Sequence, residues 1–279
     1  MRVAFQGEAG AFSEEAVEAF FENAEPVGCA SFEDVFAALE NEDADRAAIP
    51  IENSLHGSVH ANYDLLRTRE ARITGEHWMR IRHYLMARPG ASLDEMRRVR
   101  SHPQALGQCR AFLRERMPQA EVIPAHDTAG AARKVADSEG DNRTAAIASR
   151  RAADEYGLAV LAEDIESNPE NYTRFLALAR PGDAPSDEAQ DEDRPCKTSL
   201  VFALNENVPG ALFKSLAVFA LRELDLFKIE SRPLIGTPGE YVFYLDVEGA
   251  AASEPVRRAL GHLREITSEA RVLGSYPVD

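Results

Sequence analysis

Cysteine is scarce in this sequence, and its placement excludes two kinds of structure. The three cysteines, Cys29, Cys109 and Cys196, are odd in number, widely spaced and without any C-x-x-C pair. Disulfide frameworks and zinc sites need paired or closely spaced cysteines, so reduced thiols are expected. The seven histidines show no H-E-x-x-H or other ligand spacing, and His56 and His60, four residues apart, are better explained as capping or solvated side chains than as ligands. No metal is predicted.

Long apolar runs are also missing. No stretch approaches the roughly 18 apolar residues that a membrane span requires. The N-terminus runs directly into strand-like residues 2–5, without a basic and then apolar leader. The sequence therefore predicts a cytoplasmic protein.

Positive charge is in deficit. The chain has 47 acidic and 31 basic residues, a formal charge of −16 and a pI near 4.9. This charge repels phosphate backbones and anionic membranes, so neither nucleic acid nor a membrane is an expected partner. An anionic substrate would have to be held by local groups that overcome the global field.

Glycine-rich phosphate loops are incomplete. Gly7 and Gly10 lack the third glycine of G-x-G-x-x-G, and the lysine of a P-loop is absent. No nucleotide, and no other cofactor, is predicted.

The sequence does contain a regular alternation of short apolar runs and amphipathic stretches, from residue 1 to about residue 180. This alternation is typical of parallel α/β units. A chain of 279 residues is long enough for two or three domains. The predicted strands are 3–5, 47–51, 84–87, 97–100, 144–148 and 175–179, and the predicted helices are 12–21, 106–113 and 129–135.

A second composition begins near residue 181. Residues 181–195 are acidic and contain proline and glycine, which predicts a solvated linker. The pattern beyond it is βαββαβ, the ferredoxin-like order. Its predicted elements are strand 198–204, helix 209–224, strands 228–235 and 241–247, helix 254–267 and strand 271–274.

Small polar residues stand where predicted strands end and helices begin. Helix N-termini leave unpaired N–H groups and a partial positive charge, which bind carboxylates without a lysine. Open α/β sheets bind ligands at this same edge. Each such residue alone is better explained as an ordinary N-cap, but together they indicate a site for a small dianion. They are Asn53, Ser54, Ser101, His102, Asp127, Thr128 and Ser149.

Several segments resemble the signature motifs of one enzyme family. Pro-Ile-Glu-Asn-Ser at 50–54, Ser-His-Pro-Gln-Ala-Leu at 101–106 and Asn-Tyr-Thr-Arg-Phe at 171–175 look like the motifs of prephenate dehydratases. Gly-Glu-Ala-Gly-Ala-Phe-Ser at 7–13 resembles the family's opening segment. Residues 207–212 and 230–233 resemble the phenylalanine-binding motifs of its ACT domain.

The resemblance implies an α/β fold with a two-lobed catalytic region, like that of a periplasmic binding protein, and a ferredoxin-like ACT domain. Lobe 1 would be residues 1–76 plus 160–180, lobe 2 residues 77–159, and the ACT domain 196–279, with the site in the cleft between the lobes. The implied reaction is the decarboxylating dehydration of prephenate to phenylpyruvate in phenylalanine biosynthesis, regulated by L-Phe. Without a preceding chorismate mutase domain the enzyme would be monofunctional, and a homodimer or homotetramer is expected.

The same resemblance assigns roles to residues. Thr173 would be catalytic, donating a hydrogen bond or relaying a proton to the leaving hydroxyl. The family's effector motif Gly-Ala-Leu-Val reads Gly-Ala-Leu-Phe at residues 210–213. The larger Phe213 affects the size of the effector pocket. The implied substrate-binding residues are Asn53, Ser54, Ser101, Gln104, Gln108, Thr128, Ser149, Asn171, Arg174 and Phe175. The implied effector residues are Asn207, Pro209, Gly210, Ala211, Leu212, Glu230, Ser231, Arg232 and Pro233.

Three alternatives remain open. Arg174 could clamp a substrate carboxylate or form an internal ion pair. The substrate could be arogenate, which carries an ammonium where prephenate has a keto group. A chain of this fold could also be a non-catalytic sensor of a small acid, although binding alone would not require Thr173.

Overall fold

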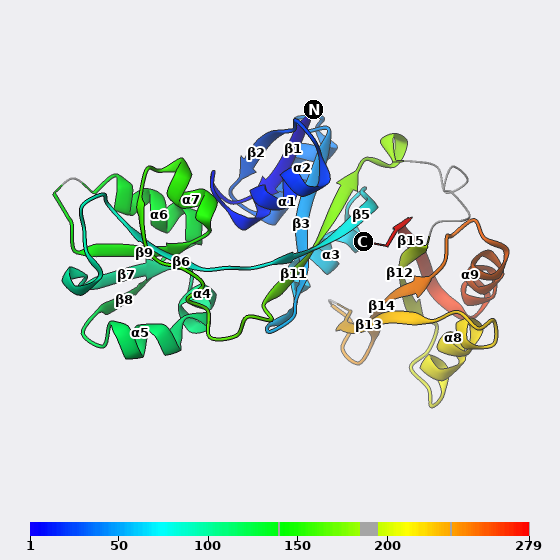
Figure 1. Ribbon diagram of the computed structural model, residues 1–279. Helices are drawn as coiled ribbons and strands as arrows, with labels where there is room; N and C mark the ends of the chain where they lie inside the picture. The colour runs from blue at the N-terminus through cyan, green and yellow to red at the C-terminus, as the bar shows by residue number, and fades with distance from the viewer. Residues whose placement is uncertain (139, 185–194, 235, 279) are drawn as a thin grey trace. The chain divides into compact units, whose positions relative to one another are not determined.

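The computed structural model describes residues 1–138, 140–184, 195–234 and 236–278 (Figure 1). Two compact units are present: Met1–Val59 with His77–Phe175, called unit 1 here, and His60–Glu76 with Leu176–Asp279, called unit 2. The chain passes from one unit to the other three times: between Val59 and His60, inside β5 (Arg72–Arg80) and inside β11 (Tyr172–Ala179). Most of the predicted linker, residues 185–194, lies outside the described residues, and the predicted domain boundaries stay a prediction.

The first half of unit 1 is built on a sheet with the order β11-β3-β1-β2. The central strand β1 pairs in parallel with both β2 and β3, and its Val3 and Phe5 are buried. A short antiparallel strand, β4, pairs with the end of β3. The elements are β1 (Arg2–Gln6), α1 (Phe12–Phe20), β2 (Glu25–Cys29), α2 (Phe32–Glu40), β3 (Arg46–Asn53) and β4 (Gly57–Ser58).

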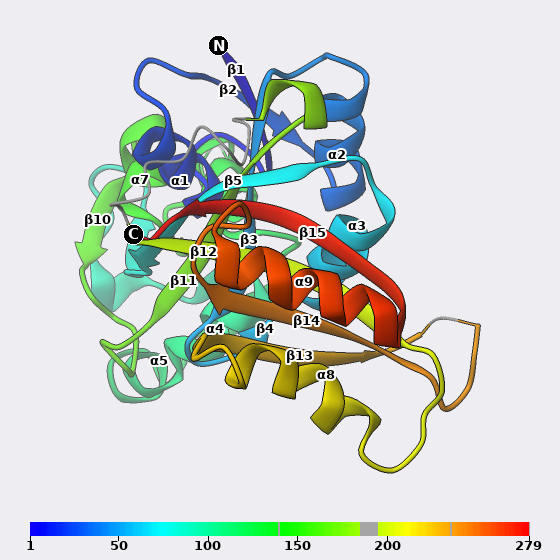
Figure 2. The ribbon, with the colours of Figure 1, turned by 90° about the vertical axis from the view of Figure 1, so that its right-hand side faces the viewer.

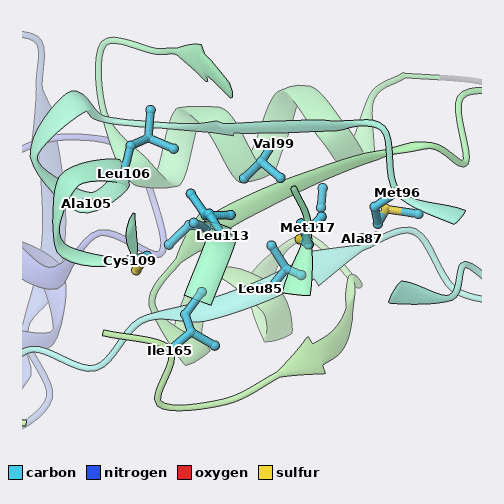
Figure 3. Close-up of a cluster of buried hydrophobic side chains, with 12 residues drawn as sticks. Leu85, Ala87, Met96, Val99, Ala105, Leu106, Cys109, Leu113, Met117 and Ile165 are labelled. Atoms are coloured by element: carbon cyan, nitrogen blue, oxygen red, sulfur yellow. The ribbon is translucent and has the colours of Figure 1, made fainter. Parts of the chain in front are cut away.

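The second half of unit 1 is a five-stranded sheet with the order β10-β6-β9-β7-β8. Leu85, Val99 and Ile147 of its strands pack with Leu106 and Leu113 of the following helices in a buried cluster (Figure 3). The elements are β6 (Tyr84–Ala87), η1 (Leu93–Glu95), β7 (Arg98–Ser101), α4 (Pro103–Gln108), α5 (Arg110–Arg116), β8 (Glu121–Pro124), α6 (Thr128–Ala136), β9 (Thr144–Ala148), α7 (Arg150–Glu155) and β10 (Ala159–Ala162).

The two halves of unit 1 meet at a close backbone approach. Gly10 has a φ of +83°, and a Cβ at this position would lie 2.7 Å from the Cα of Ala152. The Ser149 hydroxyl donates to the Gly10 carbonyl at 2.6 Å, and the Tyr156 hydroxyl donates to the Ala9 carbonyl at 2.7 Å. Glycine is therefore required at position 10 for both its conformation and its lack of a side chain.

Unit 2 confirms the predicted βαββαβ order. Its sheet runs β13-β14-β12-β15, followed by β5, with Gly274 of β15 opposite Ile73 of β5. Figure 2 shows α8 and α9 side by side over one face of this sheet. The elements are α3 (His60–Thr68), η2 (Pro181–Asp183), β12 (Cys196–Leu204), α8 (Ala211–Ala220), β13 (Leu226–Pro233), β14 (Tyr241–Glu248), α9 (Glu254–Ile266) and β15 (Thr267–Pro277).

The opposite face of the unit 2 sheet contacts α3. The Tyr63 ring of α3 stacks edge-on against Tyr244 with a centroid separation of 4.9 Å, and the Tyr244 hydroxyl donates to the Tyr63 carbonyl. Burial raises the pKa of Tyr244 above its ordinary value, so it stays a donor. A segment from the middle of the first 180 residues therefore forms part of unit 2.

Several predicted elements need correction. The single helix predicted at 106–113 is two helices, α4 and α5, that meet at Cys109. The helix predicted from residue 209 begins only at Ala211, because Gly210 has a left-handed φ of +84°. The strand predicted at 271–274 is the longer β15, since it pairs along most of β12. Five strands of the described residues were not predicted: β2, β4, β5, β8 and β10. No helix among the described residues is long and apolar enough to cross a membrane.

Unit 2 contains a buried ion pair, and replacing its residues tests how much the pair contributes to stability. Lys197 of β12 donates to the Glu76 carboxylate of β5 at 2.6 and 2.9 Å, and the two side chains are only 7% and 1% exposed. Removing one partner leaves an uncompensated buried charge, whereas replacing both with apolar residues removes the charge entirely.

We expect Glu76→Leu, which leaves the buried Lys197 ammonium without its carboxylate, to lower the free energy of unfolding by about 3–5 kcal/mol, and the double variant Lys197→Met/Glu76→Leu to lose much less. Urea denaturation of the full chain measures both. Equal losses in the single and double variants would show that shape, and not the unpaired charge, dominates at this position.

Candidate active site

Unit 1 contains a cavity of about 520 Å³, a size typical of sites for small ligands. Residues from both halves of the unit line it, and no Lys or Arg is among the described residues that do so. The lining residues are Gln6, Gly7, Ala11, Phe12, Ser13, Ala30, Ser31, Phe32, Glu33, Pro50, Asn53, Val59, Ile81, His83, His102, Gln104, Ala105, Gln108, His126, Asp127, Thr128, Thr173 and Phe175.

Four helices direct their first residues at this cavity. They are α1, α2, α4 and α6, whose N-terminal residues all appear in the lining. Ser31 caps α2 in a reciprocal capping box with Asp34, and the Asp127 carboxylate accepts from the Gly130 N–H of α6. The start of α1 has no side-chain cap, because Ala11 precedes it. Its free N–H groups and the helix dipoles make this cavity attractive to carboxylates.

Asn53 organises the polar side chains on one wall. Its Oδ1 accepts from the backbone N–H groups of Leu55 and His56, both at 3.1 Å. The two hydrogens of its Nδ2 are shared among three acceptors: Asn171 Oδ1 at 2.9 Å, the Tyr172 carbonyl at 3.1 Å and Thr173 Oγ1 at 3.0 Å. Because backbone N–H groups can only donate, the orientation of the Asn53 amide is fixed, and Thr173 Oγ1 is an acceptor in this contact.

Two histidines of the lining are neutral near neutral pH. Burial lowers the pKa of His83, and the contact of its Nε2 with Gln108 Oε1 at 2.6 Å acts in the opposite direction. Burial also lowers the pKa of His102, whose Nδ1 accepts from the Gln104 N–H at the start of α4. The lining therefore contains neutral donors and acceptors in place of fixed cations.

Six of the predicted catalytic and substrate-binding residues line the cavity together. Thr173 and Phe175 share one face of β11, since side chains two apart on a strand point the same way. The six are Asn53, Gln104, Gln108, Thr128, Thr173 and Phe175.

The other five predicted residues are not in the lining. The hydroxyls of Ser54, Ser101 and Ser149 donate to the carbonyls of Glu170, Ile147 and Gly10, each within 2.7 Å. Asn171 is fully buried behind Asn53, and Arg174, 3% exposed, follows Thr173 on the alternate face of β11. This placement favours an internal partner for Arg174 over a substrate clamp.

Sequence reasoning missed several lining residues. The pattern of Ser31 followed by Asp34 is a capping box that could have indicated the start of α2. Nothing local marks His83 or His126, because only the tertiary fold brings them to the cavity, whereas His102 lies inside the motif at 101–106 but was not assigned a substrate-binding role. No cluster of three or more potential metal ligands occurs among the described residues.

The predicted effector residues lie in unit 2. The Asn207 amide donates to the Gly239 carbonyl at 3.0 Å, and Gly210 is the N-cap of α8, which then begins with Ala211 and Leu212. On β13, Glu230 pairs with His60 at 3.3 Å and Arg232 with Asp64 at 2.8 Å, both partners belonging to α3. The alternate residues Ser231 and Pro233 are exposed, as is Pro209.

Comparison with known proteins agrees with this architecture. A family model for prephenate dehydratase matches residues 3–183. The chain is 48% identical over 288 residues to arogenate dehydratase/prephenate dehydratase 2, chloroplastic, of Arabidopsis thaliana, covering 100% of this chain and 73% of that protein. A solved prephenate dehydratase in complex with L-Phe from Arthrobacter aurescens is 36% identical, with a TM-score of 0.89 and coverage of 99% and 90%. GqqA, described as a novel type of quorum quenching acylase, is 33% identical, with a TM-score of 0.89 and coverage of 100% and 98%.

The fold and the cavity define a two-lobed α/β protein followed by a ferredoxin-like domain. The chain belongs to the prephenate dehydratase family. It is accordingly a carbon–oxygen lyase, a prephenate or arogenate dehydratase of phenylalanine biosynthesis.

The Asn53 contacts give a direct test of the site. In Asn53→Asp the carboxylate still accepts from the Leu55 and His56 N–H groups, but an acceptor replaces the donor that faces Thr173. We expect kcat to fall by about 10²-fold or more, with a smaller rise in KM. Steady-state kinetics of the purified variant measure this.

Asn168→Asp is the matched control, since Asn168 is exposed, accepts only a local backbone bond from Glu170 and does not line the cavity. Its kcat should match that of the unaltered chain. Equal losses in the two variants would contradict the assignment of Asn53.

Proposed function

We propose that the chain converts prephenate to phenylpyruvate, with Thr173 donating a hydrogen bond to the departing ring hydroxyl. The supporting observation is the contact of Thr173 Oγ1 with Asn53 Nδ2 at 3.0 Å, in a side chain that lines the cavity. Because this oxygen accepts from Asn53, its own O–H hydrogen is left to donate to another group. A ligand in the cavity can provide that acceptor.

The reaction then needs little further chemistry from the protein. The bond between the ring and its carboxylate breaks, carbon dioxide leaves, and the electron pair completes the aromatic ring as the carbon–oxygen bond breaks. The leaving hydroxyl gains a proton and departs as water. Threonine is a weak acid, so a hydrogen bond that strengthens in the transition state is the role that fits it, with full proton transfer coming from solvent.

The two substrate carboxylates would be held by the converging helix ends. The uncapped start of α1 supplies backbone N–H groups, and the side chains of Gln104, Gln108 and Thr128 supply neutral donors nearby. Ser54, Ser101, Ser149, Asn171 and Arg174 would support the site from behind the lining. No cofactor takes part in this proposal.

Arogenate is the second candidate substrate. Two observations favour it: the carboxylates of Glu33 and Asp127 line the cavity and could pair with an ammonium, and the 46% identical relative from Petunia hybrida is named arogenate dehydratase 2. Glu33 is exposed, so water screens its charge and weakens both its attraction for an ammonium and its repulsion of the substrate carboxylates.

Parallel assays decide between the candidates. Phenylpyruvate release from prephenate and phenylalanine release from arogenate would be followed without added metal or cofactor, using Thr173→Val and Thr173→Ser as variants. Loss of the hydroxyl in Thr173→Val should lower kcat by about 10²–10⁴-fold, with KM changing far less, because a single acid–base contribution has that size. Thr173→Ser keeps the hydroxyl and should keep most of the activity.

Each outcome has a definite meaning. Turnover of arogenate alone would change the substrate and keep the site. An unchanged kcat in Thr173→Val would overturn the role of Thr173. A rise in melting temperature with prephenate but no turnover of either compound would make the chain a non-catalytic sensor.

We propose that L-Phe regulates the enzyme by binding at 207–212 and 230–233, across an interface between copies in a homodimer or homotetramer. The relative from Arthrobacter aurescens was solved with L-Phe, which supports an effector site in a fold of this kind. The exposure of Ser231 and Pro233, and of Phe213 at 75%, leaves this surface available to a ligand and a second copy. A cytoplasmic location is proposed with it, supported by the free thiols of Cys29, Cys109 and Cys196.

A bulky residue at position 231 tests the effector site. Ser231→Trp should reduce the response to L-Phe at least tenfold, because the indole would fill the space that the effector requires. The measurement is the ratio of rates with and without L-Phe. Ser268→Trp, at another exposed position of unit 2, is the control and should respond as the unaltered chain does. A full response in Ser231→Trp would reject the assigned pocket.

A further inference from the structure

One buried imidazole of the cavity has no role in the function proposed above. His83 lies between β5 and β6, is 2% exposed and lines the cavity. The Phe12 ring meets it edge-on, with a centroid separation of 5.6 Å. Its Nε2 lies 2.6 Å from Gln108 Oε1, while its Nδ1 has no hydrogen-bond partner among the described residues. Buried polar atoms without partners are rare, so the tautomer of this ring must be established before a role is assigned to it.

The hydrogen-bond directions on this wall follow from Asn53. Two backbone N–H groups fix Asn53 Oδ1 as an acceptor, so Asn53 Nδ2 donates, and the Asn171 atom facing it must be Oδ1. Gln108 Nε2 lies 3.5 Å from that oxygen and 3.2 Å from His56 Nδ1, and with its nitrogen on these two partners the amide presents Oε1 to His83. An amide oxygen only accepts, and therefore His83 Nε2 must carry a hydrogen.

The remaining nitrogen of His83 is then bare. Burial holds the pKa of His83 below its ordinary value, so the ring is neutral and has a single N–H. That hydrogen is on Nε2, which leaves Nδ1 as a lone-pair acceptor. A bare Nδ1 cannot donate to a substrate carboxylate, so His83 does not serve as an anion ligand or as an acid in this state.

We propose that His83 is a positioning residue that acts through Gln108. Its Nε2–H holds Gln108 Oε1, so that Gln108 Nε2 faces Asn171 Oδ1 and keeps that oxygen in place as the acceptor beside Thr173 for the Asn53 amide. The chain of contacts runs His83, Gln108, Asn171, Asn53, Thr173 and ends at the hydroxyl that must donate. The inference rests on the proposed role of Thr173.

Two substitutions of His83 separate positioning from bulk. Glutamine can place an N–H near the position of the imidazole Nε2, whereas asparagine is too short to reach Gln108. We expect His83→Asn to lower kcat about tenfold or more with KM changed less than about twofold, and His83→Gln to restore most of the loss. His77→Asn is the matched control, since His77 packs against Phe20 outside the cavity, and its kcat should be unchanged. Equal kcat losses in His83→Asn and His83→Gln would overturn the proposal.

A double-variant cycle tests whether the effect passes through Gln108. Once Gln108→Met has removed the amide, adding His83→Asn should lower kcat by less than about twofold. If the two substitutions lower kcat independently, so that the loss in the double variant is the product of the two single losses, the positioning role is overturned. If Thr173→Val loses activity while His83→Asn does not, this inference fails alone; if Thr173→Val is fully active, the proposed function fails first.

Which nitrogen of His83 carries the hydrogen can be observed directly in the unaltered, folded chain. In the unaltered chain with ¹⁵N-labelled histidine, two-bond nitrogen–proton correlation spectra distinguish the two neutral forms of each ring, and His83→Gln identifies the His83 signals by their disappearance. A hydrogen on Nε2 at neutral pH supports the proposal. A hydrogen on Nδ1 overturns it, even if the asparagine variant does not fold.

Discussion

The candidate site depends on one constraint, the pair of backbone N–H groups that hold the carbonyl oxygen of Asn53. Amide and imidazole side chains can each present either a donor or an acceptor, so a wall made of them has no fixed direction by itself. The two backbone groups remove that freedom, because they cannot act as acceptors. Every contact from Asn53 to Thr173 on one side, and to Asn171 on the other, then has a single direction.

The cavity also solves an electrostatic problem posed by composition. The chain has a formal charge of −16, yet it belongs to a family named for a dianionic substrate. The long-range field is screened over about 8 Å at physiological salt, whereas helix dipoles and N–H groups act at contact distance. Four helix starts can therefore favour a carboxylate without any Lys or Arg among the described lining residues. Because the donors in the lining are neutral, no Lys or Arg side chain among the described lining residues competes with Thr173 for the departing hydroxyl.

The sequence predicted the parts of this molecule that obey local rules. Apolar strands such as β9 and the ferredoxin-like order of unit 2 follow from periodicity, and Thr173 follows from its motif. The strand β2 was missed because Pro26 and Gly28 interrupt its pattern, and β5 was missed because polar residues such as Glu76 lie along it.

The site residues show where such rules end. Ser101 and Ser149 stand at strand ends, as predicted, but their hydroxyls bind backbone carbonyls from other segments. His83 shows the opposite case. No neighbouring residue in the sequence identifies it as a site residue, but in the folded protein it contacts Gln108. Which strand ends face one another is decided by tertiary packing, and a single sequence does not contain that information locally.

The path of the chain restricts how this protein could be divided or recombined. Helix α3 begins one residue after Val59, yet it belongs to unit 2, where Asp64 pairs with Arg232 and Arg67 pairs with Glu269 at 2.8 Å. A cut at residues 181–195 would leave α3 on the N-terminal fragment and remove its partners. The C-terminal part is thus not an interchangeable cassette: inheriting it from another gene would require a matching α3 inside the catalytic sequence.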